Sequence, residues 1–176
     1  LDAVVFDKTG TLTTGELGVV KLSPCGEVKP KELLQAAAGA ERYSKHPAAR
    51  ALLDLAARSG LSLPEPEGFH EEAGQGVRAT VEGARVLSGR ATWLRQQGVA
   101  DAQLDTAKGE GFSVIHVARG DRYLGWIGLQ DQVRPEAKAV IAELQALRVR
   151  RLAMVTGDRE EVAQRVAAAI GCPEHV

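Results

Sequence analysis

The chain has 176 residues, of which 44% are hydrophobic, so it can form a buried core in one large domain or two small ones. Its 22 Lys and Arg residues nearly balance 23 Asp and Glu residues, which gives no sign of a nucleic-acid or membrane-surface binder. Cys25 and Cys172 lie far apart and outside any C-x-x-C spacing, which favours free thiols over a disulfide framework or a metal site. No segment is long enough and apolar enough to span a bilayer, so we expect this polypeptide by itself to be soluble.

The chain opens with a short apolar run at residues 3–6, and Asp7 is the first charge after it. Such a run is typical of a strand buried on both faces of a parallel sheet. In open α/β sheets, ligands bind beyond the carboxyl ends of the strands, so Asp7 is predicted to lie where a substrate can reach it. A carboxylate at that place can be a metal ligand, a nucleophile, or both.

The next elements are a strand at residues 17–22 and two helices. The first helix begins at Pro30, and the second spans residues 47–58, with Pro47 in its first turn and Gly60 at its stop. The segment 61–68 is rich in Pro and Glu and is predicted to be a loop.

The middle of the chain has the pattern of an antiparallel sheet with helices. Gly83 and the pair Gly120-Asp121 are typical of hairpin turns. The expected strands are 77–82, 84–87, 112–119 and 123–127, and the expected short helices are 91–97 and 101–108.

After Asp131 the pattern changes to helix, strand, helix. A helix opens at Pro135, an apolar strand follows at 151–155, and a second helix at 159–170. This βαβα order predicts a parallel sheet with a right-handed crossover.

The two ends of the chain therefore belong to one α/β domain, and the middle belongs to another. About 110 residues separate the first strand from the later parallel elements, which is far too many for a βα connection. We predict an α/β parallel-sheet domain made of residues 1–14 and 124–176, with an inserted α+β antiparallel-sheet domain at 15–123.

A second strand end carries Thr156, Gly157 and Asp158. The strand at 151–155 brings Thr156 to the same edge as Asp7, and a hydroxyl with N–H groups at a helix N-terminus can hold phosphoryl oxygens. The alternative is an ordinary helix cap after a buried strand.

Residues 7–13 read Asp-Lys-Thr-Gly-Thr-Leu-Thr and match the phosphorylation motif of P-type ATPases without a departure. Residues 156–158 match the later Thr-Gly-Asp motif of that family. The chain thus resembles P-type ATPases, whose phosphorylation domain is haloacid dehalogenase-like. The resemblance implies that Asp7 attacks the γ-phosphate of ATP to form an aspartyl phosphate, that Lys8 and Thr9 line the phosphate pocket, and that Asp7 and Thr9 hold Mg²⁺. Phosphoryl transfer needs such a nucleophile, a cation and fixed donors.

Residues 131–135 resemble the family's D-x-x-R-P segment. Asp131 and Arg134 then meet the phosphate or ribose end of the nucleotide. The alternative is a salt bridge at a helix start, and the sequence does not decide between them.

Residues 44–47 read Ser-Lys-His-Pro and resemble the Ser-Glu-His-Pro motif of the heavy-metal-transporting branch. The resemblance implies that His46, followed by Pro47, packs against adenine and that Glu41 contacts its amino edge. It also implies that the main chain approaches the nucleotide at the glycines of the downstream G-x-G motif and of the strand that follows. These are Gly74, Gly76 and Gly89, and the last precedes Arg90, where many relatives carry Asn.

By resemblance, this chain is a fragment of the cytoplasmic part of a metal-transporting ATPase, with ATP or ADP, Mg²⁺ and the other domains of the parent as its partners. We expect the fragment to be monomeric, to contact no nucleic acid, and to lack the family's later lysine and G-D-G-x-x-N-D motif. The transported metal would pass only through membrane helices. Two alternatives remain: a phosphatase of the same superfamily, which would carry an acid at position 9, and a nucleotide-binding module without catalysis.

Overall fold

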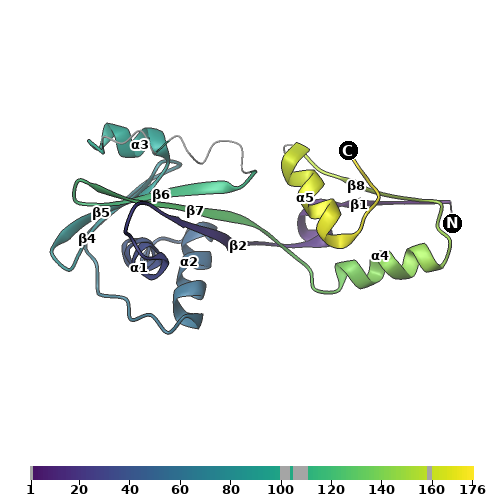
Figure 1. Cartoon of the computed structure of the whole chain (residues 1–176), viewed down its shortest axis with the longest axis horizontal. Helices are drawn as coiled ribbons and strands as arrows, with labels where there is room; N and C mark the ends of the chain where they lie inside the picture. The colour runs from purple at the N-terminus through teal and green to yellow at the C-terminus, as the bar shows by residue number, and fades with distance from the viewer. Residues whose placement is uncertain (1, 100–103, 105–110, 158–159) are drawn as a thin grey trace. The chain divides into compact units, whose positions relative to one another are not determined.

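The computed structural model describes residues 2–99, 104, 111–157 and 160–176. The chain forms two compact units. We call Leu1–Glu16 with Asp131–Val176 the split unit, and Leu17–Gln130 the inserted unit. The strands β2 (Thr13–Pro24) and β7 (Arg122–Val133) each have residues in both units (Figure 1).

The split unit contains a parallel sheet of three strands in the order β1-β8-β9. These are β1 (Ala3–Asp7), β8 (Arg151–Val155) and β9 (Glu174–His175). The helix α4 (Ala137–Ala146) precedes β8 and α5 (Glu160–Ile170) follows it, so the predicted order of strand and helix and the predicted parallel sheet are confirmed. Between β1 and β2 the chain forms a short helical turn, η1 (Lys8–Leu12).

Burial in the split unit corrects one prediction about β1. Val4 and Phe6 pack against the core cluster, whereas Val5 is 63% exposed and Val155 on β8 is 44% exposed. Successive side chains of a strand point to opposite faces, and the core lies against one face only. The prediction that β1 is buried on both faces is therefore wrong for the described structure. The core cluster consists of Leu12, Ala137, Ile141, Leu152, Met154, Ala163, Val166, Ala167, Ile170 and Cys172.

The inserted unit contains a six-stranded sheet in the order β2-β7-β6-β5-β4-β3. The remaining strands are β3 (Glu67–Glu72), β4 (Gly76–Val81), β5 (Ala84–Gly89) and β6 (Ser113–Arg119), and each consecutive pair from β3 to β7 is antiparallel. The predicted hairpins at Gly83 and Gly120 are confirmed. β3 begins inside the segment predicted as loop. Pairing with β4 stabilises this strand, and the local sequence pattern does not indicate that pairing.

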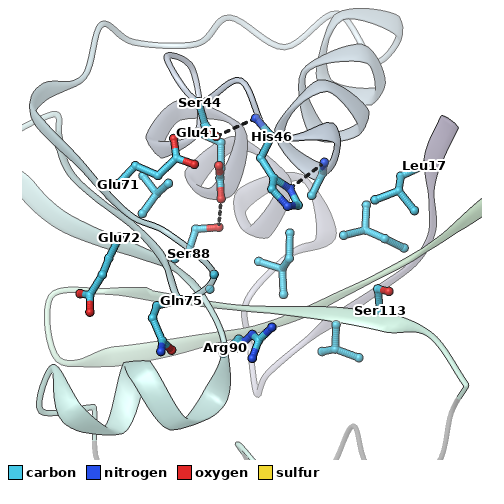
Figure 2. A pocket seen from close by; sticks show the side chains of 18 residues that line it. Leu17, Glu41, Ser44, His46, Glu71, Glu72, Gln75, Ser88, Arg90 and Ser113 are labelled. Carbon is cyan, nitrogen blue, oxygen red and sulfur yellow. Dashed lines mark hydrogen bonds between the residues drawn. The ribbon is translucent and has the colours of Figure 1, made fainter.

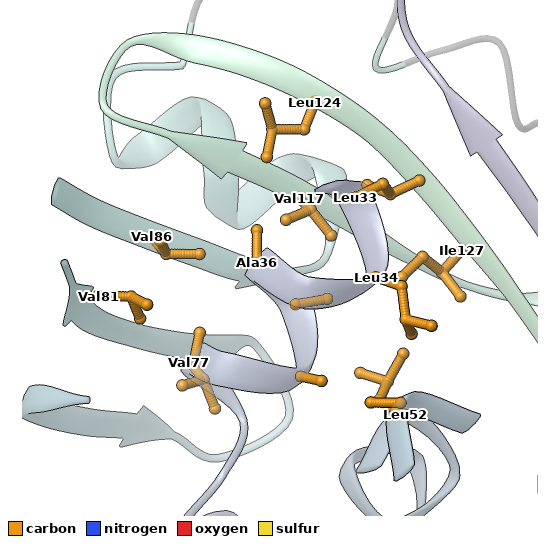
Figure 3. Packing of buried hydrophobic residues seen from close by; sticks show 14 of the residues in the cluster. Leu33, Leu34, Ala36, Leu52, Val77, Val81, Val86, Val117, Leu124 and Ile127 are labelled. Atoms are coloured by element: carbon orange, nitrogen blue, oxygen red, sulfur yellow. The ribbon is translucent and has the colours of Figure 1, made fainter. Parts of the chain in front are cut away.

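Helices cover both faces of this sheet. α1 (Pro30–Ala40) and α2 (Pro47–Arg58) contribute to one core cluster, and α3 (Ala91–Gln96) contributes to another. Neighbouring strand residues alternate between the two clusters, as Val86 and Leu87 do, so the clusters lie on opposite faces. Figure 1 shows α1 and α2 on one side of the sheet and α3 on the other, and Figure 3 shows the first cluster, with Leu33 and Leu52.

The helix ends follow local chemistry. α2 begins at Pro47 and ends at Arg58, as predicted, and Gly60 beyond it takes the left-handed conformation that ends helices (φ 65°). The helix predicted at 101–108 lies outside the described residues except for Leu104, which is buried. Within the described ranges, no helix has both the length and the apolar character needed to cross a membrane.

Candidate functional site

Asp7 lies at the carboxyl end of β1 with its side chain exposed, and it does not cap η1. The parallel ladder pairs it with Val155, the last residue of β8, so Thr156 leaves the sheet at the same edge. The N–H of Thr156 donates to the carbonyl of Val176 at 3.0 Å. Gly157 is exposed, with open space where a Cβ would lie. Asp158 lies outside the described residues.

The turn that carries Asp7 into η1 is fixed by its own hydrogen bonds. Gly10 takes a left-handed conformation (φ 80°), which costs glycine little. The hydroxyl of Thr13 donates to the carbonyl of Lys8 at 3.1 Å, and the N–H of Gly10 donates to that hydroxyl at 3.3 Å. The exposed side chain of Thr9 is thereby presented from an ordered turn directly after Asp7.

Lys8 is buried, and its Nζ lies 3.0 Å from Oδ2 of Asp131. The exposed fractions of the two side chains are 4% and 17%. A buried ammonium is tolerated only with such a partner. In this structure Asp131 therefore neutralises the residue next to Asp7.

Arg134 binds the same turn through main-chain carbonyls. Its Nε donates to Thr11 at 2.9 Å and its second guanidinium nitrogen donates to Gly10 at 3.0 Å. A guanidinium nitrogen of Arg134 also lies 3.9 Å from Oε1 of Glu136, at the start of α4. The helix-start salt bridge is therefore weak compared with the two hydrogen bonds to the turn. Asp131 and Arg134 together brace the turn that follows Asp7, a role that neither sequence alternative described.

The donor set at Asp7 suits a hard cation. Mg²⁺ in phosphoryl-transfer sites takes one or two carboxylates, main-chain oxygens, and otherwise water and phosphate oxygens. Asp7 offers an exposed carboxylate, and Thr9 follows it in the braced turn. Among the described residues, no group of three or more His, Cys, Asp and Glu could hold a metal by itself. When bound there, Mg²⁺ would offset the negative charge of a transferring phosphoryl group.

The inserted unit contains a cavity of about 270 Å³ between the end of α1, the start of α2 and the sheet. Figure 2 shows Glu41, Ser44 and His46 on one side of it, with Ser88 and Arg90 opposite. The cavity brings together five residues predicted from separate motifs: Glu41, His46, Gly74, Gly76 and Gly89. Pro47 lies beside it as the first residue of α2. Apolar side chains of Leu17, Ile115 and Leu129 complete its walls.

Glu41 is the C-cap residue of α1 and is only 5% exposed. Its Oε1 accepts a hydrogen bond from the hydroxyl of Ser88 at 2.8 Å. Burial raises the pKa of Glu41 to about 7; hydrogen bonds from Ser88 and Ser44 oppose this rise, and the charge of Glu71 adds to it. The carboxyl group is therefore poised to change its protonation state near neutral pH.

His46 is the N-cap residue of α2, and its Nδ1 accepts a hydrogen bond from the N–H of Ala48 at 3.2 Å. Because that N–H can only donate, the ring proton of neutral His46 must be on Nε2. The helix-start interpretation and the binding-site interpretation are thus compatible, because one ring nitrogen caps the helix while the ring lines the cavity.

Glycine occupies the three cavity positions for different physical reasons. Gly74 takes a left-handed conformation (φ 72°) with open space around it. Gly76 and Gly89 are opposite each other on β4 and β5, and a Cβ at Gly76 would lie 2.5 Å from the carbonyl oxygen of Ser88 and 2.8 Å from Cε3 of Trp93. Gly76 is therefore demanded by packing inside the protein, as well as by any approach of a ligand.

The predictions from the sequence missed several residues that line the cavity. Among them, the buried Ser88 has a direct hydrogen bond to the predicted residue Glu41. Glu71 and Glu72 line it from β3, and Glu72 accepts a hydrogen bond from the indole N–H of Trp93 at 2.8 Å. Arg90, which follows Gly89 in the sequence, is the single Lys or Arg among the lining residues that the structure describes, beside three carboxylates. No local motif marks Ser88, Glu71 or Glu72 as cavity residues, because their contacts join distant parts of the chain.

The family model for haloacid dehalogenase-like hydrolases matches residues 1–176. The chain belongs to that family. The fold of the chain also agrees with that of a solved P-type ATPase. The crystal structure of a zinc-transporting PIB-type ATPase aligns over 100% of this chain and 29% of its own, with a TM-score of 0.87 and 35% identity.

Homologues of the whole chain within this family are heavy-metal P-type ATPases. The copper-exporting P-type ATPase B of Archaeoglobus fulgidus is 36% identical over 176 residues, which are 99% of this chain and 25% of that protein. The cadmium, zinc and cobalt-transporting ATPase of Bacillus subtilis is 34% identical over 170 residues, which are 97% of this chain and 24% of that protein. The chain thus spans about a quarter of the length of these relatives.

Proposed function

We propose that this chain is the ATP-binding catalytic part of a metal-cation-transporting P-type ATPase, on the cytoplasmic side of a membrane-spanning parent. The inserted unit binds ATP, and Asp7 accepts its γ-phosphate, which drives export of a transition-metal ion by the parent. The observation that carries this proposal is the gathering of Glu41, His46 and the three glycines around one cavity. The heavy-metal P-type ATPases that match the whole chain support it independently.

The cavity suits the base of a nucleotide. The carboxyl group of Glu41 can accept a hydrogen bond from the amino group of adenine, and the ring of His46 offers a flat surface for stacking. Stacking contributes on the order of 1–3 kcal/mol and each exposed hydrogen bond about 1 kcal/mol, so we expect affinities from roughly millimolar to high micromolar. Weak binding suits a unit that must also release ADP.

The split unit supplies the phosphate acceptor. An oxygen of the Asp7 carboxylate forms a bond to the γ-phosphorus as the bond from that phosphorus to the β–γ bridging oxygen breaks, and ADP leaves. The hydroxyl of Thr156 and the N–H groups beyond it can donate to the phosphoryl oxygens. Lys8 acts through Asp131 by keeping the turn after Asp7 in place.

Titration with a non-hydrolysable ATP analogue, followed by NMR, tests the nucleotide site. His46→Asn keeps an acceptor at the helix N-cap and removes the ring, whereas His46→Ala removes both. We expect His46→Asn to unfold at nearly the wild-type temperature and to bind about tenfold more weakly, with or without Mg²⁺. Equal affinity in His46→Asn and wild type would contradict the proposed adenine site.

Labelling with γ-labelled ATP tests the acceptor. Label on Asp7 should be stable in acid, released by hydroxylamine and absent in Asp7→Asn. We propose that this chain alone binds ATP but accepts phosphate slowly or not at all. Strong labelling would contradict that impairment, and hydroxylamine-resistant label would contradict Asp7 as the acceptor.

A further inference from the structure

The floor of the cavity contains a hydrogen bond between two buried side chains from distant parts of the inserted unit. Ser88 on β5 is fully buried, with 0% of its surface exposed, and its hydroxyl lies 2.8 Å from Oε1 of Glu41 at the end of α1. Figure 2 shows this bond as the link between the α1 side of the cavity and the sheet. Serine is an unusual choice at so buried a strand position, where the neighbours Val86 and Leu87 are apolar.

The bond has a directional consequence for Glu41. An ionised carboxylate accepts hydrogen bonds at both oxygens, and Ser88 occupies one of them. Ser44 also donates to this carboxyl group, and because the two oxygens together offer about four acceptor sites, capacity remains for a donor that enters the cavity. Fixing one oxygen also fixes the plane of the carboxyl group, so that a ligand meets an oriented acceptor instead of a rotating one.

We infer that Ser88 is a positioning residue of the nucleotide site, whose hydroxyl holds Oε1 of Glu41 so that Oε2 is presented to the exocyclic amino group of a purine. This inference rests on the proposed function of the cavity. It assigns the buried hydroxyl a role in base recognition, although Ser88 acts through Glu41 and does not itself contact the base.

The role implies a pH dependence that can be measured. A hydroxyl that donates to a carboxylate favours its ionised form, so removal of the Ser88 hydroxyl raises the pKa of Glu41 further above its ordinary range. The ionised form accepts more strongly from an amino group, so nucleotide affinity rises with pH as Glu41 loses its proton. Ser88→Ala shifts this rise to higher pH.

Other titratable and charged groups line the cavity and must be held constant. They are His46 before α2, Glu71 and Glu72 on β3, and Arg90 after β5. Because all four are unchanged in Ser88→Ala, their titration affects both proteins alike. The difference between the two pH profiles therefore isolates the effect of the hydroxyl on Glu41.

The experiment is a titration of the full chain with a non-hydrolysable ATP analogue from about pH 5.5 to about pH 9. We expect Ser88→Ala to bind about tenfold more weakly near neutral pH and to recover part of this loss at the alkaline end, where Glu41 is ionised in both proteins and only the orienting effect of the hydroxyl is missing. Glu41→Gln, which cannot ionise, should lose the Glu41-dependent part of the profile. Val81→Ala, a core truncation in the same sheet, is the control for general loosening and should keep the wild-type midpoint.

The possible outcomes separate the two proposals. Wild-type affinity of Ser88→Ala at every pH, or an unchanged midpoint, would overturn the role of Ser88 while leaving nucleotide binding in place. Absence of binding by the wild type would overturn the proposed function and the inference with it. The ¹³C resonance of the Glu41 carboxyl group, followed through the same pH range without nucleotide, must shift its midpoint upward in Ser88→Ala, and an unshifted midpoint would also overturn the inference.

Discussion

Lys8 and Asp131, which are 123 residues apart in the sequence, form a buried ion pair with a distance of 3.0 Å between Nζ and Oδ2. The pair ties the turn after Asp7 to the start of the segment that leads into α4. It explains how two short segments of chain, on either side of a long insertion, hold one strand end in a defined geometry.

Asp131→Asn should destabilise the split unit by about 3 kcal/mol, because it removes the carboxylate that lies 3.0 Å from the buried ammonium of Lys8. The double variant Lys8→Met with Asp131→Leu should cost less than Asp131→Asn, which would show the coupling directly. Both tryptophans, Trp93 and Trp126, lie in the inserted unit, so hydrogen exchange of the β8 amides is the suitable measurement. Unchanged exchange in Asp131→Asn would contradict the importance of the pair.

Arg134→Lys should loosen the turn at η1 without unfolding the sheet. Lysine cannot reproduce the planar fork that donates to Gly10 and Thr11, whereas the main-chain bond from residue 134 to Leu12 at 3.0 Å is kept. We expect amide protection around Leu12 to fall roughly tenfold, the equivalent of about 1.4 kcal/mol, with β8 protection unchanged. Equal loss in both places would indicate global destabilisation instead.

Glu41 should make the stability of the inserted unit fall as pH rises. Its pKa is raised from 4.5 to about 7 in the folded protein. Below 4.5 both the folded and the unfolded forms are protonated, and between 4.5 and 7 the unfolded form loses its proton first, so stability is lost through that window and the full cost is reached above 7.

Glu41→Gln removes this dependence. The free energy of unfolding of the variant, relative to that of wild type, should rise by about 3 kcal/mol between acidic and mildly alkaline pH. Urea unfolding followed through tryptophan fluorescence measures this difference. A constant difference between the two proteins across the pH range would show that Glu41 does not titrate in this window.

Gly76→Ala should be much more damaging than Gly74→Ala. A Cβ at Gly76 would lie 2.5 Å from the Ser88 carbonyl oxygen and 2.8 Å from both the Gly89 Cα and the Trp93 ring, so main chain must move. We expect Gly76→Ala to lower the free energy of unfolding by about 2 to 3 kcal/mol, whereas Gly74→Ala should lower it by about 1 kcal/mol through conformational strain. The indole N–H resonance of Trp93, which donates to Glu72, reports the distortion locally and should shift in Gly76→Ala alone.

Arg90→Gln should weaken binding of the ATP analogue by roughly fivefold to tenfold and leave adenosine binding within about twofold, because an exposed charge contributes about 1 kcal/mol toward phosphate. Arg90 is exposed and, within the described part of the chain, is the single Lys or Arg that lines the cavity, together with three carboxylates. Arg78→Gln, an exposed arginine on β4 outside the cavity lining, is the matched control. Equal loss for adenosine and the ATP analogue would place the effect of Arg90 on the base end instead.

The sequence by itself determined the elements whose signals are local. Proline at the first turn and glycine past the end set both bounds of α2, and a run of apolar residues set β8. The order of strands and helices predicted the parallel sheet, and the register that pairs Asp7 with Val155 confirmed that Thr156 leaves at the same edge. The predicted cavity residues lie in short motifs, whose spacing can be read along the chain.

Only the tertiary structure decided which groups contact one another. The pairing of Lys8 with Asp131 and of Ser88 with Glu41 joins residues 123 and 47 positions apart, and a hydrogen bond over such a separation depends on packing that no local pattern encodes. The one-sided burial of β1 was missed for the same reason, because an apolar run shows that a strand can be covered but not how many of its faces are. The raised pKa of Glu41 likewise arises from burial, a property of the fold and not of the residue.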